Sequence, residues 1–352
     1  MKTYKIGLVG CGTVGQGFMD ILFRKAAALK KEQGFEAKIV AIADMIKGNL
    51  IAPQGIDLKK TLRVLGEGKT LHVVDPKAAK YDGWKAVDII AAAKTDIIAE
   101  LTYTDIKTGE PATSHIRKAL ETGKHVVTSN KGPAALHYAA LKALADRKKR
   151  FFRIEGTVMS GTPVFTLCER GFAGNTIKEI QGILNGTTNF ILTKMELENM
   201  DYADALALAQ KLGYAEADPT ADVGGFDALA KVVILSNVLL GGKLKPSAIT
   251  PEGITGISKD MVMAAKAEGY RYKLVGFTRR EGGKVVAGVS PRKLPLSDPL
   301  TGVMGAKNAL TFDLDLMGPV TIQGAGAGKT ETGHAILQDV LAIHHDLGYD
   351  RT

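Results

Sequence analysis

A loop near the middle of the chain gathers carboxylates just before a lysine. Four of them lie in a stretch that also contains a proline and two glycines, and they are Glu216, Asp218, Asp222 and Asp227. Asp227 and Lys231 are four residues apart, which places them on one face of a helix. A solvated ion pair of this kind contributes little. The apolar neighbours in "ALAKVVIL" predict partial burial, where a lysine beside a carboxylate can hold and transfer a proton.

A glycine motif lies close to the N-terminus. Gly10-Cys11-Gly12-Thr13-Val14-Gly15 follows the apolar run "KIGLV" and precedes a segment with helical spacing. Strand, glycine turn and helix are the context that G-x-G-x-x-G requires. Gly10 permits the tight turn, Gly12 lets the backbone approach a pyrophosphate, and Gly15 lets the helix and strand pack closely. The helix N-terminus then offers its N–H groups to the phosphates.

The second predicted strand, residues 37–43, ends at Asp44. An acidic residue at this place bonds the ribose hydroxyls of an adenine dinucleotide and favours NAD. The gap from the glycines exceeds the usual spacing of about 20 residues, so the first helix or its exit loop is extended. Two alternatives stay open: Lys47 would hold the extra phosphate of NADP, and Asp44 would only cap a turn.

Two further strands are predicted at residues 95–102 and 124–130, with a helical stretch between them. Strands that alternate with helices indicate an α/β fold with a parallel, doubly wound sheet. Ligands of such sheets bind beyond the carboxyl ends of the strands. Thr102, Asn130 and Lys131 lie at those ends, which predicts a functional role for the Lys131 cation.

A second glycine-rich stretch, "QGAGAGKT" at residues 323–330, resembles a phosphate loop of the Walker type. That motif is G-x-x-x-x-G-K-[ST], so with Gly328, Lys329 and Thr330 as its end the first glycine would be residue 323. Gln323 occupies this position, and no strand ending in an acidic Walker B residue lies nearby. The sequence therefore argues against ATP hydrolysis and for one bound nucleotide.

The composition sets the outer limits. The chain has 352 residues, of which 45% are hydrophobic and 24% charged, which is typical of a soluble protein with room for two domains. No apolar run reaches the roughly 18 to 20 residues of a membrane helix, and no signal peptide is expected. The net charge of +9 is scattered without interleaved aromatics, which favours a small anionic ligand over nucleic acid. Two cysteines, Cys11 and Cys168, fit a reducing cytoplasm.

Four segments resemble homoserine dehydrogenase. They are "GILNGTTNFILTKM" (182–195), "GYAEADPTADVGGFDALAK" (213–231), "TSNKGPAAL" (128–136) and "LMGPVTIQGAGAG" (316–328). The resemblance extends from residue 5 to about residue 345, without room for the aspartate kinase or ACT domain that many members carry. It implies a Rossmann-type domain from residues 1–148 and 319–352, and an α+β substrate-binding and dimerisation domain from residues 149–318.

The activity that the resemblance implies is the NAD(P)H-dependent interconversion of L-aspartate 4-semialdehyde and L-homoserine. This hydride transfer belongs to the aspartate-derived route to threonine, methionine and isoleucine. Lys231 corresponds to the proposed proton donor and acceptor at the substrate oxygen, and Lys131 to a lysine near cofactor and substrate that is also argued to be catalytic. The choice between the two lysines stays open. Asp227 corresponds to a substrate-binding carboxylate and Glu216 to the partner of the substrate amino group.

The resemblance also implies a set of cofactor contacts and a cation site. The cofactor contacts are Gly10, Gly12, Thr13, Val14, Gly15, Asp44, Thr102, Lys131, Gly213, Glu216 and Gly326. The loop "EGTVMSGTP" corresponds to the family's site for a monovalent cation, with sodium expected and potassium left open. Its ligands would be the Glu155 side chain and the backbone carbonyls of Val158, Ser160 and Thr162, which are hard oxygen donors. The last helix is expected to pack on the first domain, and the protein to be a homodimer.

One stretch departs from the family pattern. Leu101-Thr-Tyr-Thr104 stands where many members have a pair of glycines, so the cofactor contacts of this loop are open. Two other functions remain as alternatives. One is a related amino-acid oxidoreductase such as an aspartate dehydrogenase, and the other is a nucleotide-sensing protein without turnover.

Overall fold

A computed structural model describes residues 1–349 of the chain. It divides into two compact units, one formed by Met1–Pro163 with Gly328–Thr352 and the other by Val164–Ala327. We expected the boundaries after Lys148 and before Pro319. The structural boundaries come later because residues 155–162 pack against the last helix of the first unit, whereas residues 318–325 pair with a strand of the second.

The first unit contains a six-stranded sheet with the strand order β3-β2-β1-β4-β5-β6. Its strands are β1 (Lys2–Val9), β2 (Phe35–Asp44), β3 (Gly48–Ile51), β4 (Ile97–Glu100), β5 (His125–Thr128) and β6 (Phe152–Arg153). All neighbours are parallel except β2 and β3, which form an antiparallel pair at the edge. The predicted doubly wound sheet is confirmed, and the strand order reverses at β1.

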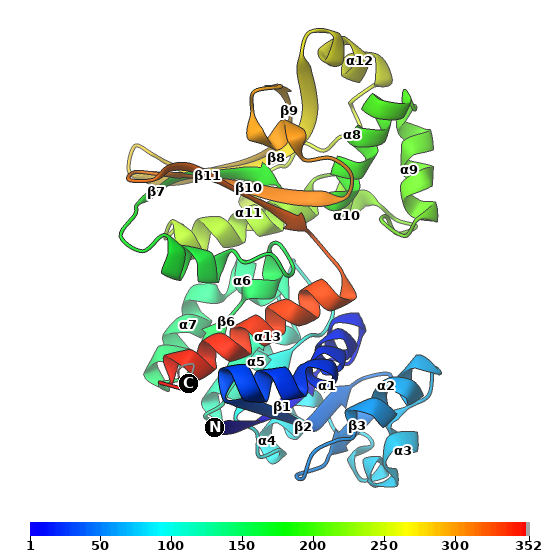
Figure 1. Cartoon of the computed structure of the whole chain (residues 1–352), viewed down its shortest axis with the longest axis vertical. Helices are drawn as coiled ribbons and strands as arrows, with labels where there is room; N and C mark the ends of the chain where they lie inside the picture. Colours follow the sequence, from blue (N-terminus) through cyan, green and yellow to red (C-terminus); the bar gives the residue numbers. More distant parts are fainter. Residues whose placement is uncertain (350–352) are drawn as a thin grey trace. The chain divides into compact units, whose positions relative to one another are not determined.

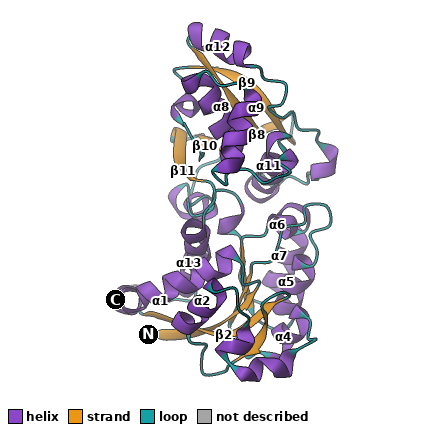
Figure 2. Ribbon diagram, turned by 90° about the vertical axis from the view of Figure 1, so that its right-hand side faces the viewer, coloured by secondary structure: helices purple, strands orange, loops and turns teal. Residues whose placement is uncertain are grey.

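Helices cover both faces of this sheet, with α1 and α13 on one side of the strands and α4 and α5 on the other (Figure 2). The helices are α1 (Thr13–Gln33), α2 (Leu58–Gly66), α3 (Leu71–Val74), α4 (Ala86–Ala92), α5 (Ala112–Glu121), α6 (Lys131–Leu136), α7 (Tyr138–Arg147) and α13 (Lys329–Asp346), with short turns η1 (Pro76–Tyr81) and η2 (Glu155–Thr157). The length of α1 accounts for the long gap between the glycine motif and Asp44.

The last helix packs on the first unit, as predicted. Figure 1 shows α13 beside α1, the helix that follows the glycine motif. The two backbones meet at Gly17 and Gly333, and a Cβ atom on Gly17 would lie 2.0 Å from the carbonyl oxygen of Lys329. Any larger residue would push the helices apart. Ile336 and Val340 of α13 therefore join the same buried core as the first strand.

The second unit is an α+β unit built on a five-stranded antiparallel sheet with the order β11-β10-β7-β8-β9. Its strands are β7 (Ile177–Ile183), β8 (Tyr270–Glu281), β9 (Lys284–Pro295), β10 (Lys307–Leu314) and β11 (Gly318–Ala325). Its helical segments are η3 (Leu167–Gly171), α8 (Gly186–Glu198), α9 (Tyr202–Lys211), α10 (Thr220–Val223), α11 (Phe226–Leu239), η4 (Pro246–Ala248), α12 (Lys259–Ala267) and η5 (Pro299–Gly302). The apolar helix α11 packs on β8 and β9, with residues 228–236 buried.

Within residues 1–349, no helix has the length and apolar character needed to cross a membrane. This agrees with the absence of a long apolar run in the sequence.

Candidate active site

The glycine motif forms the predicted turn between β1 and α1. Gly10 has a φ of 92°, and a Cβ atom there would lie 2.5 Å from the carbonyl oxygen of Leu101. A Cβ on Gly15 would lie 2.8 Å from the carbonyl oxygen of Gly10, so this glycine allows the helix to pack on the turn. At Gly12 no atom lies within 4 Å of such a Cβ, which leaves the backbone open to a close ligand. Thr13 and Val14 begin the helix.

Asp44 at the end of β2 connects the glycine turn to the turn that follows β2. One carboxylate oxygen accepts a hydrogen bond from the Cys11 amide at 2.7 Å. The other accepts from the amides of Ile46 at 3.0 Å and Lys47 at 2.9 Å. Asp44 thus caps a turn, as one of our alternatives predicted. The same contacts hold its negative charge next to the glycine turn, where a ribose would lie.

The ends of β4 and β5 are joined by Asn130. Its side-chain amide donates to the carbonyl oxygens of Tyr103 at 2.9 Å and Thr102 at 3.3 Å. Its amide oxygen accepts from Gly132 N at 3.1 Å and so caps α6, in which Lys131 is the first residue. The segment that replaces the glycine pair is therefore anchored to the start of the helix that carries Lys131.

The predicted lysine and carboxylate meet in the second unit. The Nζ atom of Lys231 lies 2.8 Å from Oδ2 of Asp227 and donates to the carbonyl oxygen of Leu184 at 2.7 Å. Lys231 is only 7% exposed, so this is not a solvated ion pair. The expectation of a part-buried pair on one helix face is confirmed.

Asn185 and Asp222 complete the cluster; we noted Asp222 among the carboxylates of this loop but assigned neither residue a role in the site. The Asn185 amide donates to Asp222 at 2.7 Å and to Asp227 at 3.1 Å, while its oxygen accepts from Thr188 N at 2.8 Å and caps α8. Burial raises the pKa of Asp222, and the charges of Asp227 and Glu216 raise it further, while the Asn185 hydrogen bond and Lys231 oppose the shift. The polar run "NGTT" after a predicted strand is the sequence signal that could have indicated Asn185 as a helix-capping residue at this site.

The remaining carboxylates of the loop lie at the surface. Glu216 is exposed, and its backbone carbonyl accepts from the Gln210 side chain at 3.1 Å. Asp218 is also exposed and accepts from Thr220 N at 3.1 Å at the start of α10. Hydrogen bonds from the Thr220 hydroxyl and from its amide lower the pKa of Asp218. Gly213, with a φ of 78°, ends the preceding helical segment.

The glycine-rich stretch near the C-terminus does not form a phosphate loop. Its first part is β11, an edge strand of the antiparallel sheet. Gly326 lies against the buried side-chain amide of Asn308, whose nitrogen would be 2.2 Å from a Cβ there. Gly328 packs against the Glu331 carboxylate at the start of α13. An acidic group at that helix end disfavours phosphate.

The loop proposed for a cation belongs to the first unit. Glu155 is buried in η2, and its amide donates to Oδ2 of the buried Asp339 at 2.8 Å. Val158 and Ser160 are buried too, and Ser160 has a left-handed φ of 52°. Thr162 N donates to the carbonyl of Met159 at 3.0 Å. The buried Glu155 carboxylate and the carbonyls of this turn are hard oxygen donors of the kind that a monovalent cation would take.

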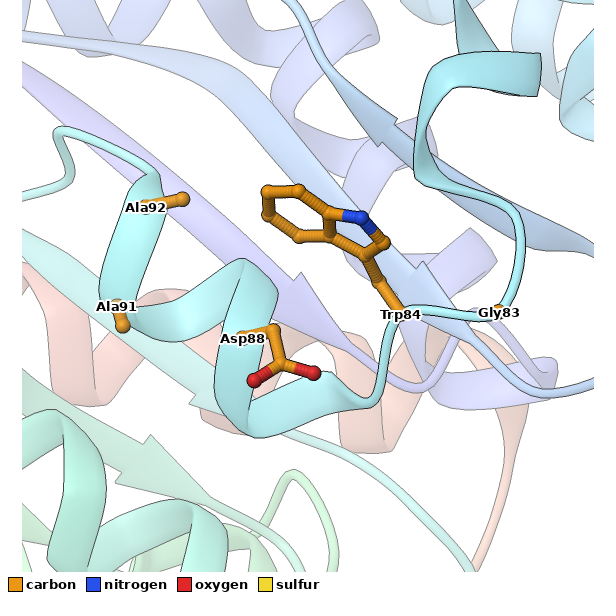
Figure 3. A pocket seen from close by; sticks show the side chains of 5 residues that line it. All are labelled: Gly83, Trp84, Asp88, Ala91 and Ala92. Carbon is orange, nitrogen blue, oxygen red and sulfur yellow. The ribbon is translucent and has the colours of Figure 1, made fainter.

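A surface hollow of about 590 Å³ lies elsewhere in the first unit, along α4. Gly83, Trp84, Asp88, Ala91 and Ala92 line it (Figure 3). Asp88 already accepts from Lys85 N at 2.9 Å. None of the predicted site residues lines this hollow.

A dinucleotide-binding sheet and a unit with a buried lysine–carboxylate pair define an NAD(P)-dependent oxidoreductase. A model described as the homoserine dehydrogenase NAD binding domain matches residues 10–155, and one described as homoserine dehydrogenase matches residues 163–341. The chain belongs to the homoserine dehydrogenase family.

Relatives and solved structures agree with this family. The chain is 43% identical to an NAD(+)-dependent homoserine dehydrogenase of Pseudomonas canavaninivorans, covering 98% of this chain and 97% of that one. It is 38% identical to a homoserine dehydrogenase of Methanocaldococcus jannaschii, with 96% and 98% covered. A structure of a putative homoserine dehydrogenase from Archaeoglobus fulgidus has a TM-score of 0.86 at 38% identity, with 97% and 99% covered. A hyperthermophilic archaeal enzyme in complex with NADPH has a TM-score of 0.78 at 28% identity, with 98% of each chain covered.

Proposed function

We infer that this chain catalyses the reaction of its family, the NAD(P)-dependent interconversion of L-aspartate 4-semialdehyde and L-homoserine. This reaction serves the biosynthesis of threonine, methionine and isoleucine. The observation that carries the inference for this chain is the buried contact of Lys231 with Asp227 at 2.8 Å, in a chain that also has an intact dinucleotide turn. A nucleotide sensor would have no use for the lysine–carboxylate pair.

Lys231 is proposed as the group that moves the proton. The bound nicotinamide supplies the hydride, and negative charge then grows on the aldehyde oxygen. The Nζ atom of Lys231 gives one N–H to Leu184 O and one to Asp227, which leaves a third N–H for the substrate oxygen. Proton transfer from this ammonium neutralises the growing charge. In the reverse direction the neutral amine accepts the proton.

The carboxylates around Lys231 suit a substrate with an ammonium group. Asp227 is proposed to bind the substrate beside the lysine, and Glu216 to meet its amino group. Asn185 holds Asp222 and Asp227 with one amide, so both carboxylates have fixed directions. Lys131, which begins α6 in the first unit, is proposed as a further substrate and cofactor contact and as the other candidate for the proton transfer.

We propose NAD as the preferred cofactor. The carboxylate of Asp44 is held by three backbone amides at the carboxyl end of β2, where it can accept from the ribose hydroxyls. The extra phosphate of NADP would face this fixed negative charge. The relative from Pseudomonas canavaninivorans is named as NAD(+)-dependent, which supports the same preference. Asp44→Ala should therefore weaken NAD more than NADP, and an equal loss for both would leave Asp44 only its capping role.

A monovalent cation, with sodium expected, is proposed for the loop of residues 155–162. The carboxylate of Glu155 would be a side-chain ligand, with Val158, Ser160 and Thr162 binding through backbone carbonyls. A cation there would hold the loop against α13, with which its Glu155 amide already makes a hydrogen bond. Thermal unfolding measured in sodium, potassium and choline chloride at equal ionic strength tests this, because choline cannot enter the site.

A homodimer is proposed through the antiparallel sheet. The strand register places Phe277, Gln181 and Thr311 in one row, on the face opposite to Gly276, which faces Val232 of α11. The guanidinium groups of Arg279 and Arg292 lie over the Phe277 ring, at 5.0 and 4.6 Å from its centroid. Light scattering of the wild type and of Phe277→Asp tests this face. A cytoplasmic location is also proposed, since neither cysteine is disulfide-bonded.

The proposed reaction is tested by absorbance of reduced nicotinamide. The purified chain is mixed with L-homoserine or L-aspartate, each with NAD or NADP. Turnover with L-homoserine, faster with NAD, is the expected result. Turnover with L-aspartate alone would favour the alternative of an aspartate dehydrogenase, and tight cofactor binding without any turnover would favour a sensor.

A further inference from the structure

Glu100, the last residue of β4, is a fully buried carboxylate with 0% exposure. Carboxylates are seldom buried in this way without a cationic partner. Among residues 1–349, no lysine or arginine pairs with Glu100. Its oxygen Oε1 instead accepts from the Thr102 hydroxyl and lies 3.3 Å from Nδ1 of His115 on α5. The carboxylate is thus held mainly by hydroxyl and imidazole groups.

A second set of contacts joins Glu100 to the end of β5. The Thr128 hydroxyl donates to the backbone carbonyl of Glu100 at 2.7 Å. The same hydroxyl oxygen accepts from the amide of Asn130 at 3.0 Å. Asn130 in turn holds the Thr102 carbonyl and caps the helix that begins with Lys131. One network therefore fixes the carboxyl ends of two neighbouring strands.

The strand order gives this network its place along a dinucleotide. The pyrophosphate position is the glycine turn after β1, and Asp44 marks the adenosine ribose at the end of β2, on one side of β1. β4 and β5 lie on the other side of β1. A dinucleotide stretched across the carboxyl ends of the sheet therefore has its nicotinamide half at β4 and β5.

We propose that Glu100 is a positioning residue for the nicotinamide half of the cofactor. Because the Thr102 hydroxyl gives its proton to Glu100, its oxygen remains an acceptor for the hydroxyl or amide donors of the nicotinamide riboside. The link to Thr128 and Asn130 runs mainly through the backbone carbonyl of Glu100, while its carboxylate lies 3.4 Å from the Thr128 hydroxyl, so the positioning role of the side chain acts through Thr102. This inference rests on the proposed function, because it presupposes that the glycine turn binds a nicotinamide dinucleotide.

The test compares two ligands in two variants. Glu100→Met keeps the length of the side chain but has no oxygen to accept a hydrogen bond, whereas Glu100→Gln keeps an acceptor at Oε1. NADH and ADP-ribose, which lacks the nicotinamide, are titrated against both. In Glu100→Met we expect NADH binding to weaken roughly tenfold or more, as for the loss of a hydrogen bond to a charged group, with ADP-ribose binding nearly unchanged. Glu100→Gln should restore most of the NADH affinity.

The matched control is Glu121→Met, which changes an exposed carboxylate of α5, the helix that carries His115. It should leave both affinities unchanged. Equal losses of NADH and ADP-ribose in Glu100→Met, or no loss of NADH, would overturn the proposal. Should Glu100→Met not fold, Thr102→Val removes the oriented hydroxyl and must show the same selective loss of NADH. A wild type that binds neither ligand would instead refute the proposed function itself.

Discussion

Two buried lysines of the second unit differ in their partners. Lys231 is 7% exposed and Lys273 is 1% exposed. Each donates to one backbone carbonyl, Lys231 to Leu184 and Lys273 to Val303 at 2.6 Å. Lys231 also contacts the Asp227 carboxylate, whereas Lys273 reaches only the neutral Asn189 side-chain oxygen at 2.8 Å and the sulfur of Met304.

The comparison separates the lysine that we propose for catalysis from one with a structural role. Burial lowers the pKa of Lys273 to about 8, with Arg271 adding to the shift and Glu196 opposing it. Its hydrogen bonds tie β8 to α8 and to the loop at Val303, which is a structural role. At Lys231, Asp227 supplies the opposing charge in direct contact, and the neighbouring carboxylates are those that we propose as substrate contacts.

The largest difference is expected when each lysine is changed to methionine. Lys231→Met removes the proposed proton donor, and general acid–base catalysis contributes roughly 10²- to 10⁴-fold, so kcat should fall by that factor. Lys273→Met should retain turnover within a few-fold of wild type, because Lys273 lies outside the cluster around Asp227. Steady-state kinetics with L-homoserine and NAD measures both.

The Lys273 variant is the matched control for the loss of a buried amine. NADH binding should be unchanged in both variants, since the glycine turn belongs to the other unit. Comparable losses of kcat in Lys231→Met and Lys273→Met would contradict the proposal that Lys231 is catalytic and Lys273 structural. A large loss of kcat in Lys131→Met, together with near wild-type turnover in Lys231→Met, would assign the proton transfer to Lys131 instead.

A smaller effect is expected when the counter-charge alone is removed. Asp227→Asn keeps the shape of the side chain but leaves Lys231 without a carboxylate contact. We expect kcat/KM for L-homoserine to fall about 10- to 100-fold, the range of a lost hydrogen bond to a charged group. Asp218→Asn is the control, because Asp218 is an exposed carboxylate of the same loop, and its kcat/KM should stay near wild type. Equal losses of kcat/KM in Asp227→Asn and Asp218→Asn would show that the contact of Asp227 with Lys231 is not what matters for activity.

A further effect concerns stability and pH. The pKa of Lys273 is about 8 in the folded state and 10.5 as its ordinary value. Between these values the unfolded chain binds the proton that the folded chain has released, so this lysine makes the free energy of unfolding rise with pH. The full difference amounts to about 3 kcal/mol.

Urea unfolding of the wild type and Lys273→Met between pH 7 and pH 10.5 measures this contribution. The stability of the wild type relative to the variant should be constant below about pH 8 and rise above it. A relative stability that falls with pH would show that the folded state holds the Lys273 proton more tightly than the unfolded chain does.

Local spacing made part of the site predictable from the sequence. The glycine turn depends on three residues within six positions, and Asp227 and Lys231 are one helical turn apart. Backbone geometry alone brings such groups together. The doubly wound sheet followed equally from alternating strands and helices.

Contacts between distant segments could not be predicted in this way. Asn185 is separated by 37 residues from Asp222 and by 42 from Asp227, and only the packing of α8 beside α10 and α11 brings them together. Glu100 and Thr128 are 28 residues apart and meet because β4 and β5 are neighbours. The resemblance implied a return to the first unit at residue 319, whereas residues 318–325 pair with β10 of the second unit and the first unit resumes at Gly328.

The chemical step can be observed directly in a single turnover. The complex of enzyme and NAD is mixed with saturating L-homoserine, and the first formation of bound NADH is followed for the wild type and for Lys231→Met. If Lys231 accepts the proton as the hydride leaves, the wild type shows a fast phase that the variant lacks, although the variant binds NADH normally. A fast phase of wild-type rate in Lys231→Met would contradict the role of this lysine and the account built on it.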